Sequence, residues 1–126
     1  METKIKSYRD LQVWQRAVEL AVHIYQATGD FPKTEQYGLT NQMRRAAVSV
    51  ASNIAEGHGR TEAEFARYLS ISLGSLAELE TQLEIARRVG YFSEQAFTQL
   101  SEEANVLGRQ LNVLSQRVSA SLQRRR

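Results

Sequence analysis

The residue types that usually carry catalysis or bind metals are scarce in this 126-residue chain. There is no cysteine, which excludes disulfides, thiolate metal sites and cysteine nucleophiles. The two histidines are His23 and His58, and neither belongs to the Glu-x-x-His pairs that hold di-metal centres in helical bundles. Glu19 lies four residues before His23, a spacing common among surface pairs on helices. Since a glycine-rich phosphate loop is also absent, we expect no enzyme activity, catalytic residue, metal site or cofactor.

Two polar residues, Asn53 and Glu56, lie three apart in a stretch of small and apolar residues, so they share one face of a helix. In a functional interpretation, Glu56 acts as an acid or a ligand. In a structural interpretation, Asn53 hydrogen-bonds backbone groups of the adjacent turn, and Glu56 pairs with an arginine such as Arg60 or Arg45. Buried polar groups are tolerated when they are satisfied in this way, so we favour the structural role.

Apolar residues at helical spacing indicate the elements that carry these side chains. The first helix is expected from about Asp10 to Thr28, with Ser7 and Asp10 spaced as a capping box. A second helix is expected through residues 42–57. It should end at Gly57, because glycine enters the left-handed capping conformation without strain.

The third and fourth helices show apolar residues that alternate at spacings of three and four, the pattern of paired bundle helices. Thr61 and Glu64 are spaced as a capping box that opens the third helix. The fourth helix opens near Ser93, after a short turn at residues 90–92. With no competing strand pattern, the sequence predicts an all-α fold, an antiparallel up-down-up-down four-helix bundle.

Length and the apolar pattern indicate a single domain, residues 1–126. Its ends, residues 1–7 and 123–126, are expected to be flexible. The first ten residues contain no apolar stretch of signal-peptide length, and no apolar run in the chain is long enough to cross a membrane. We therefore expect a cytoplasmic protein without membrane contact.

Basic residues concentrate at the two ends of the chain, although the formal net charge is only +2. Residues 104–126 hold five arginines and no acid, and residues 1–9 hold three basic residues against one acid. The intervening residues 10–103 carry 8 basic and 13 acidic residues. This asymmetry favours an anionic partner for the ends.

In the predicted bundle, the start of helix one, the turn between helices two and three, and the end of helix four share one pole. The amino termini of helices one and three also point outward there and favour anions. The cations expected at this pole, or about two turns from it, are Lys4, Lys6, Arg9, His58, Arg60, Arg67, Arg117, Arg124, Arg125 and Arg126. We predict that they bind nucleic-acid phosphates in a sequence-independent, salt-dependent manner. The alternative is that the terminal arginines are only a solvated, disordered end.

A second apolar set lies beside the main stripe of helix three, at Tyr68, Ile71, Ile85 and Val89. Excess apolar surface of this kind commonly marks a subunit interface. The alternative is a broad core contact with helix two.

The stretch around Asn53 and Glu56 also resembles the signature of a bacterial four-helix-bundle family. The matching residues are Gln42, Arg45, Ala46, Ala47, Ser49, Val50, Ser52, Asn53, Ile54, Ala55, Glu56 and Gly57. The family includes the 23S rRNA intervening-sequence proteins and the accessory variability proteins of diversity-generating retroelements. The resemblance covers roughly residues 8–92, and members of the family often have proline where this chain has Ala51.

This resemblance implies a small bundle that assembles into a ring-like homopentamer. It implies association with nucleic acid, and we expect RNA rather than DNA as the partner. The alternative that it implies is an accessory subunit that docks onto another protein, such as the reverse transcriptase of a diversity-generating retroelement. Under either interpretation Asn53, Glu56 and Gly57 are expected to be structural residues of the signature.

Overall fold

The computed structural model describes residues 5–125 and is all-helical over them. The α-helices are α1 (Gln12–Ala27), α2 (Leu39–His58), α3 (Glu62–Arg88) and α4 (Glu94–Arg124). Three short 3-10 helices lie before α2, at Tyr8–Asp10, Thr28–Asp30 and Lys33–Glu35. The predicted fold class is confirmed. Within the described residues, no helix has both the length and the apolar character that a bilayer-spanning segment needs.

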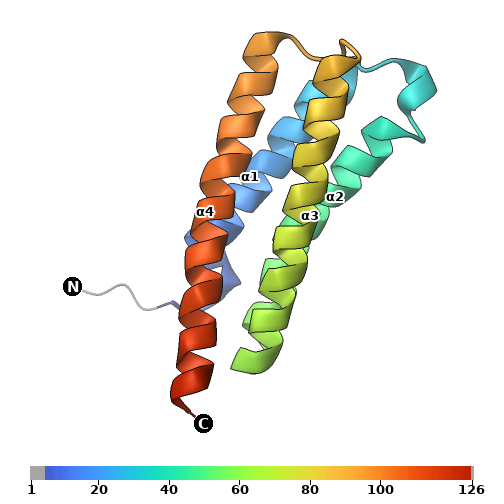
Figure 1. The fold of residues 1–126 in the computed structure, drawn as a ribbon. Coiled ribbons are helices and arrows are strands. Elements are labelled where there is room, and N and C mark those ends of the chain that lie inside the picture. The colour runs from blue at the N-terminus through green and yellow to red at the C-terminus, as the bar shows by residue number, and fades with distance from the viewer. Residues whose placement is uncertain (1–4, 126) are drawn as a thin grey trace.

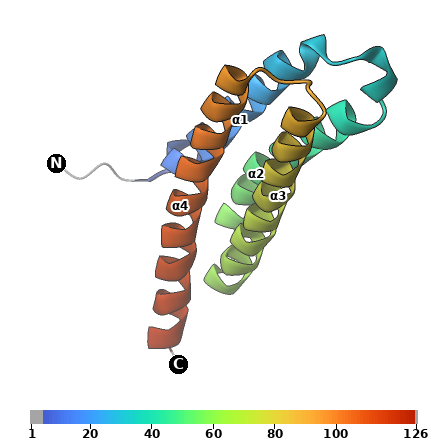
Figure 2. The ribbon, with the colours of Figure 1, turned by 45° about the horizontal axis from the view of Figure 1, so that its top comes forward.

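The four helices form a bundle in which each helix packs against two others, in the pairs α1–α2, α2–α3, α3–α4 and α1–α4. Chain direction alternates from one helix to the next (Figure 1). The α2–α3 turn and the end of α4 therefore lie in the same half of the molecule as the start of α1. Because α1 has 16 residues and α4 has 31, α4 extends past the start of α1 (Figure 2).

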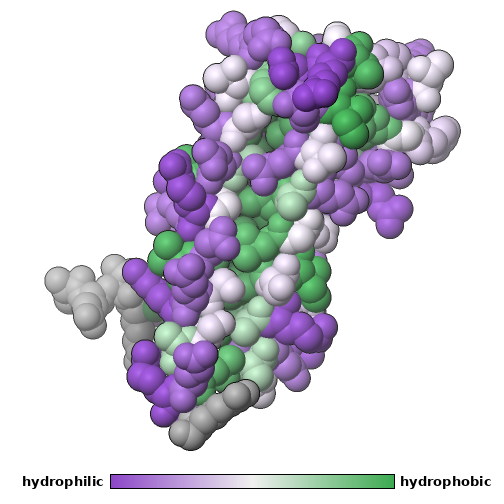
Figure 3. All heavy atoms as spheres, in the orientation of Figure 1, coloured by the Kyte–Doolittle hydropathy of each residue, from purple (hydrophilic) through white to green (hydrophobic). Residues whose placement is uncertain are grey.

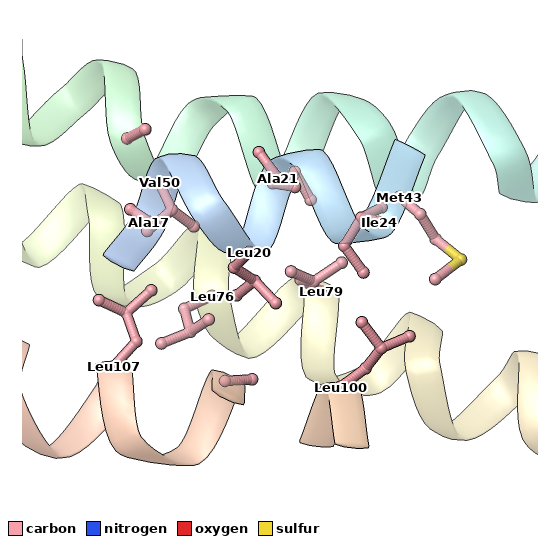
Figure 4. Packing of buried hydrophobic residues seen from close by; sticks show 14 of the residues in the cluster. Ala17, Leu20, Ala21, Ile24, Met43, Val50, Leu76, Leu79, Leu100 and Leu107 are labelled. Atoms are coloured by element: carbon pink, nitrogen blue, oxygen red, sulfur yellow. The ribbon is translucent and has the colours of Figure 1, made fainter. Parts of the chain in front are cut away.

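Leucines on α3 and α4 occupy the centre of the bundle, as their three-and-four spacing predicts. Leu76, Leu79 and Leu107 are at most 1% exposed. They face Leu20 and Ile24 of α1 in the core (Figure 4). Small residues on α2, including Ala46 and Ala47, are buried as well and allow the neighbouring helices to come close.

The predicted helix starts are largely those of the structure. Ser7 and Asp10 form a capping box, but this box caps the 3-10 helix Tyr8–Asp10. Helix α1 begins at Gln12, two residues after the expected start at Asp10. The Thr61 side chain accepts a hydrogen bond from the Glu64 backbone N–H at 3.3 Å, at the start of α3. Ser93 caps α4 in the same way. Side-chain caps satisfy amide groups that have no partner within the helix.

The prediction that Gly57 ends the second helix is wrong. Helix α2 continues through Gly57 to His58, and the only positive φ within residues 5–125 belongs to Gly90, at +84°. Gly57 is buried against α3, and a Cβ atom placed on it would lie 2.5 Å from Cβ of Tyr68. Glycine is therefore needed at this position for close approach of two helices, and not for a left-handed cap.

At the opposite pole, a hydrogen-bonded pair ties the two helix connections together. The Tyr91 hydroxyl donates to Glu35 Oε2 at 2.8 Å, and the Leu39 backbone N–H donates to Glu35 Oε1 at 3.1 Å. Both bonds hold the pKa of Glu35 below its ordinary value, and the bond from Tyr91 has the larger effect. The bond between Tyr91 and Glu35 also raises the pKa of Tyr91. The charged form of Glu35 is therefore favoured in the folded protein.

We expect Glu35→Gln to lower the free energy of unfolding at pH 7, where the carboxylate of the native protein is charged. A carboxyl group with a lowered pKa contributes stability above its unfolded pKa and loses it as pH falls through the folded value. The difference between the wild type and Glu35→Gln should therefore shrink below about pH 4.5. Urea unfolding at several pH values measures this difference in the free energy of unfolding. Glu80→Gln, an exposed site on α3, is the control, and a constant difference at Glu35 would contradict the expectation.

Candidate nucleic-acid interface

The segment before α1 is held in place by hydrogen bonds to Asp10. Its carboxylate accepts from the Lys6 backbone N–H at 2.8 Å and from the Ser7 backbone N–H at 3.2 Å. These two bonds are the main reason that the pKa of Asp10 is lowered, and a smaller contribution comes from His58 in the α2–α3 region. Gln15 Nε2 also donates to the Arg9 carbonyl at 2.9 Å. The backbone that carries Lys6 and Arg9 is thus fixed beside the start of α1.

Arg9 lies against aromatic side chains. Its guanidinium carbon is 5.3 Å from the centre of the Trp14 ring and 5.7 Å from that of Tyr8. The two rings meet edge to face, with centroids 5.2 Å apart. Arg9 makes no ion pair within residues 5–125, so its charge is available to an anion.

The α2–α3 turn is less cationic than a count of its basic residues suggests. Arg60 pairs with Glu56, and its Nη1 also lies 3.5 Å from Glu64 Oε2. The hydrogen bond to Glu56 is the largest cause of the raised pKa of Arg60. His58 packs edge-on against Phe65, with ring centroids 5.7 Å apart. The local acids therefore offset most of the charge at the turn.

Arg67 lies one and a half turns into α3 and stays exposed. Its guanidinium carbon is 4.7 Å from the centre of the Tyr68 ring, and that of Arg60 is 5.3 Å from the same ring. Arg67 has no ion pair among the residues that the structure describes. It lies on the α3 side of the bundle, away from α1.

The end of α4 meets the start of α3, as the antiparallel arrangement requires. Arg125 Nη2 lies 3.4 Å from Glu62 Oε1, and the Ser121 hydroxyl donates to Glu62 Oε2 at 3.1 Å. Arg124 is exposed and makes no ion pair in the described part of the chain. Lys4 and Arg126 lie outside the described residues.

A cleft of about 390 Å³ runs between the segment before α1, the start of α1 and α4. Arg109 and Arg117 line it together with apolar residues such as Ile5 and Val113, and no acidic residue lines it. Gln110 also lines the cleft, and its Oε1 atom is buried without a hydrogen-bond partner in residues 5–125. The cleft therefore combines two cations with an apolar lining and no acid.

Arg109, Arg117 and Arg124 together form what we call the arginine face of α4. Arg117 and Arg124 lie seven residues apart, so they project from one side of the helix about 10.5 Å apart along its axis. No acid occurs from Ala104 to the end of the helix. Hydrophilic side chains line α4, while apolar side chains reach the surface between α3 and α4 (Figure 3). Guanidinium groups in this setting can bind phosphate oxygens in a bidentate manner.

The structure thus separates the predicted cations into two groups. Arg60 and Arg125 are engaged by acids, and His58 is packed on Phe65. Lys6, Arg9 and Arg117 lie around the start of α1, because α1 starts beside the middle of the longer α4. The sequence-based set omitted Arg109, although its place in the acid-free stretch before Arg117 was a usable signal. It also omitted Glu62 and Glu64 as charges of the turn, whereas the pairing of Glu56 with Arg60 was expected and is present.

The polar residues of the signature connect α2 to itself and to α3. Asn53 Nδ2 donates to the Ser49 carbonyl at 2.8 Å and contacts Ser49 Oγ at 3.0 Å. The Ser49 and Ser75 hydroxyls are 2.8 Å apart, which joins the two helices. With Glu56 bound to Arg60, both polar residues make the contacts of the structural interpretation.

Comparison with known proteins relates the sequence to one family. Residues 9–113 match the family model described as "23S rRNA-intervening sequence protein". The chain also resembles a crystal structure at 1.70 Å resolution of a protein of unknown function from the S23 ribosomal protein family of Bacteroides thetaiotaomicron VPI-5482. The two share 22% sequence identity with a TM-score of 0.74, over 82% of this chain and 97% of that chain. No curated protein of similar sequence was found.

Proposed function

Since this chain belongs to the 23S rRNA-intervening sequence protein family, we propose that it is a non-enzymatic, oligomeric protein that binds the phosphate backbone of structured RNA. The observation that carries the proposal is the arginine face of α4, beside a cleft without acids. Guanidinium–phosphate contacts of this kind release counterions and do not depend on base sequence.

RNA is the favoured nucleic acid because of the family to which the chain belongs. The name of this family refers to an intervening sequence of 23S rRNA.

The proposal is tested by measuring the affinity for an RNA hairpin and for the DNA hairpin of the same sequence, from about 50 to 200 mM salt. We expect both affinities to fall steeply with salt, with RNA bound more tightly. A second RNA hairpin of unrelated sequence should bind equally well. Absence of binding at the lowest salt, or an affinity that ignores salt, would overturn the proposal.

Self-association as a homopentamer forms part of the proposal. The apolar residues Ile71, Ile85 and Val89 on the outer side of α3 are 40%, 48% and 56% exposed, whereas Tyr68 is half-buried. These exposed side chains support a subunit interface on α3. A ring repeats the arginine face in each subunit, which strengthens the attraction for a polyanion.

We expect the double variant Ile85→Glu/Val89→Glu to lower the oligomer mass, since charges buried in an apolar interface are costly. Light scattering measures the mass, for which the wild type should give five times the 14.3 kDa of one chain. Ala77→Glu, at an exposed site of the same helix, should leave the mass unchanged. A wild-type mass of one chain would contradict both the ring and this interface.

A second candidate function is that of an accessory subunit that docks onto another protein, such as a reverse transcriptase. It is favoured by an apolar groove of about 480 Å³ between α1 and α2. Val22, Tyr25 and Val48 line the groove and are 47%, 47% and 42% exposed. Co-purification with a co-expressed reverse transcriptase after nuclease treatment, lost in Val48→Glu, would support docking over direct RNA binding.

A further inference from the structure

Three side chains with metal-ligating atoms meet where α1 packs against α4, toward the end of the bundle that lies away from the arginine face. They are Glu19 and His23 of α1 and Glu103 of α4. His23 Nδ1 lies 2.6 Å from Glu103 Oε1. One ligand atom from each of the three residues lies within 4.8 Å of the others.

The fold brings these residues together by two separate routes. Glu19 and His23 are one turn apart on the same side of α1, so the helix itself places them next to each other. Glu103 is eighty positions further along the chain, and reaches them because α4 runs antiparallel to α1. The sequence therefore indicates only the surface pair of Glu19 and His23, and the structure adds Glu103 as the third side chain.

Pairing between His23 and Glu103 accounts for only part of the cluster. A carboxylate oxygen of Glu19 also lies within 4.8 Å of the other ligand atoms, although two carboxylates near one site repel each other when both are charged. Neither glutamate makes an ion pair with lysine or arginine within residues 5–125. The cluster thus gathers two acids around a single imidazole, an arrangement that a cation would relieve.

We propose that Glu19, His23 and Glu103 bind one divalent transition-metal ion of the zinc type. Zinc accepts histidine nitrogen and carboxylate oxygen ligands at about 2.0–2.2 Å, which places tetrahedral ligand atoms about 3.3 Å apart. The three ligand atoms lie within 4.8 Å of one another, so no distance between them has to change by more than about 1.5 Å to reach that spacing. The mixture of imidazole and carboxylate groups suits zinc-like ions better than calcium or magnesium, which prefer oxygen alone.

The site is open to the ion and to a further ligand. A cleft of about 390 Å³ adjoins His23 and Glu103 and is lined also by Gln26 and Gln99. It leaves room for a water molecule at the fourth position of a tetrahedral site. The side chains of His23 and Glu103 are 38% and 28% exposed, so an ion can reach them from solvent.

A bound ion would join α1 to α4, two helices that no direct connection links in the chain. An ion that binds the folded state and not the unfolded one stabilises the fold by RT ln(1 + c/Kd), where c is the ion concentration, so the effect grows with the ion concentration. The site does not depend on RNA binding, because its residues and those of the arginine face are different.

The test uses the full chain after treatment with EDTA and dialysis. Titration calorimetry with ZnCl₂ should give one ion per chain, and zinc should raise the melting temperature measured by circular dichroism. We expect His23→Gln and Glu103→Gln each to weaken zinc binding at least tenfold, because each removes one of three ligands. Glu19→Gln should weaken it as well, which tests the third ligand.

The matched control is His58→Gln, which removes the other histidine, far from the cluster and packed on Phe65. It should bind zinc as the wild type does. Cobalt gives a second readout, since its visible absorption on binding should be lost in His23→Gln and kept in His58→Gln. Absence of zinc binding at millimolar concentration, or equal affinity in the wild type and in a helical His23→Gln protein, would overturn the proposal.

Discussion

Reversing Arg109, Arg117 and Arg124 to glutamate is expected to lower the affinity for RNA at least about a hundredfold at roughly 0.1 M salt. The change removes three cations that make no ion pair among the described residues and replaces them with three anions. The helix should remain folded, because glutamate is a good helix former and Arg109, Arg117 and Arg124 are exposed. Fluorescence anisotropy with a labelled RNA hairpin measures the loss.

The control for this prediction is the reversal of Lys33, Arg45 and Arg88, three exposed cations away from the arginine face. Both triple variants change the net charge by the same amount, so a general loss of attraction would affect them equally. We expect the fold-loss of affinity in the control to be less than about one tenth of the fold-loss in the arginine-face variant. Equal losses would mean that RNA responds only to net charge and that the arginine face is not the binding site.

The second large effect is expected at Gly57. Gly57→Ala should lower the free energy of unfolding by about 1–3 kcal/mol, the range for overpacked sites. The added Cβ would lie 2.5 Å from Cβ of Tyr68 and 3.1 Å from Cδ1 of Phe65, so α2 and α3 have to move apart. This cost should exceed the roughly 1 kcal/mol that alanine gains over glycine within a helix. Urea unfolding measures the difference.

Gly74→Ala is the matched control, because Gly74 is also helical but exposed. A Cβ atom at Gly74 would meet nothing within 4 Å. We therefore expect this substitution to raise the free energy of unfolding by about 0.5–1 kcal/mol. If Gly57→Ala is stabilising to the same extent, the α2–α3 contact is not as close as the structure indicates.

Much of the fold follows from local pattern. The leucine spacing of α3 and α4, the capping residues Thr61 and Ser93, and the turn at Gly90 are each read within a few residues of the chain. Short connections then leave the antiparallel bundle as the simple arrangement. The observed start of α1 lies two residues after the expected one, because a 3-10 turn at Tyr8–Asp10 precedes the helix.

The remaining features depend on contacts between distant residues. Gly57 looked like a cap because its neighbour across the helix contact, Tyr68, cannot be recognised from sequence. Arg125 binds Glu62 only because α4 returns to the start of α3. Arg60 is different, since Glu56 and Glu64 lie four residues away on either side. Its pair with Glu56 was among those expected from the sequence, and its pair with Glu64 could have been expected from the same helical spacing.

The most direct test of RNA binding by the arginine face is the slope of log affinity against log salt concentration for an RNA hairpin. Each phosphate that a cation neutralises contributes about 0.7–0.9 to this slope. We predict that Arg117→Gln makes the slope shallower by about that amount, while Arg88→Gln leaves it unchanged. A wild-type slope near zero, or a slope that Arg117→Gln does not alter, would contradict phosphate binding at this face.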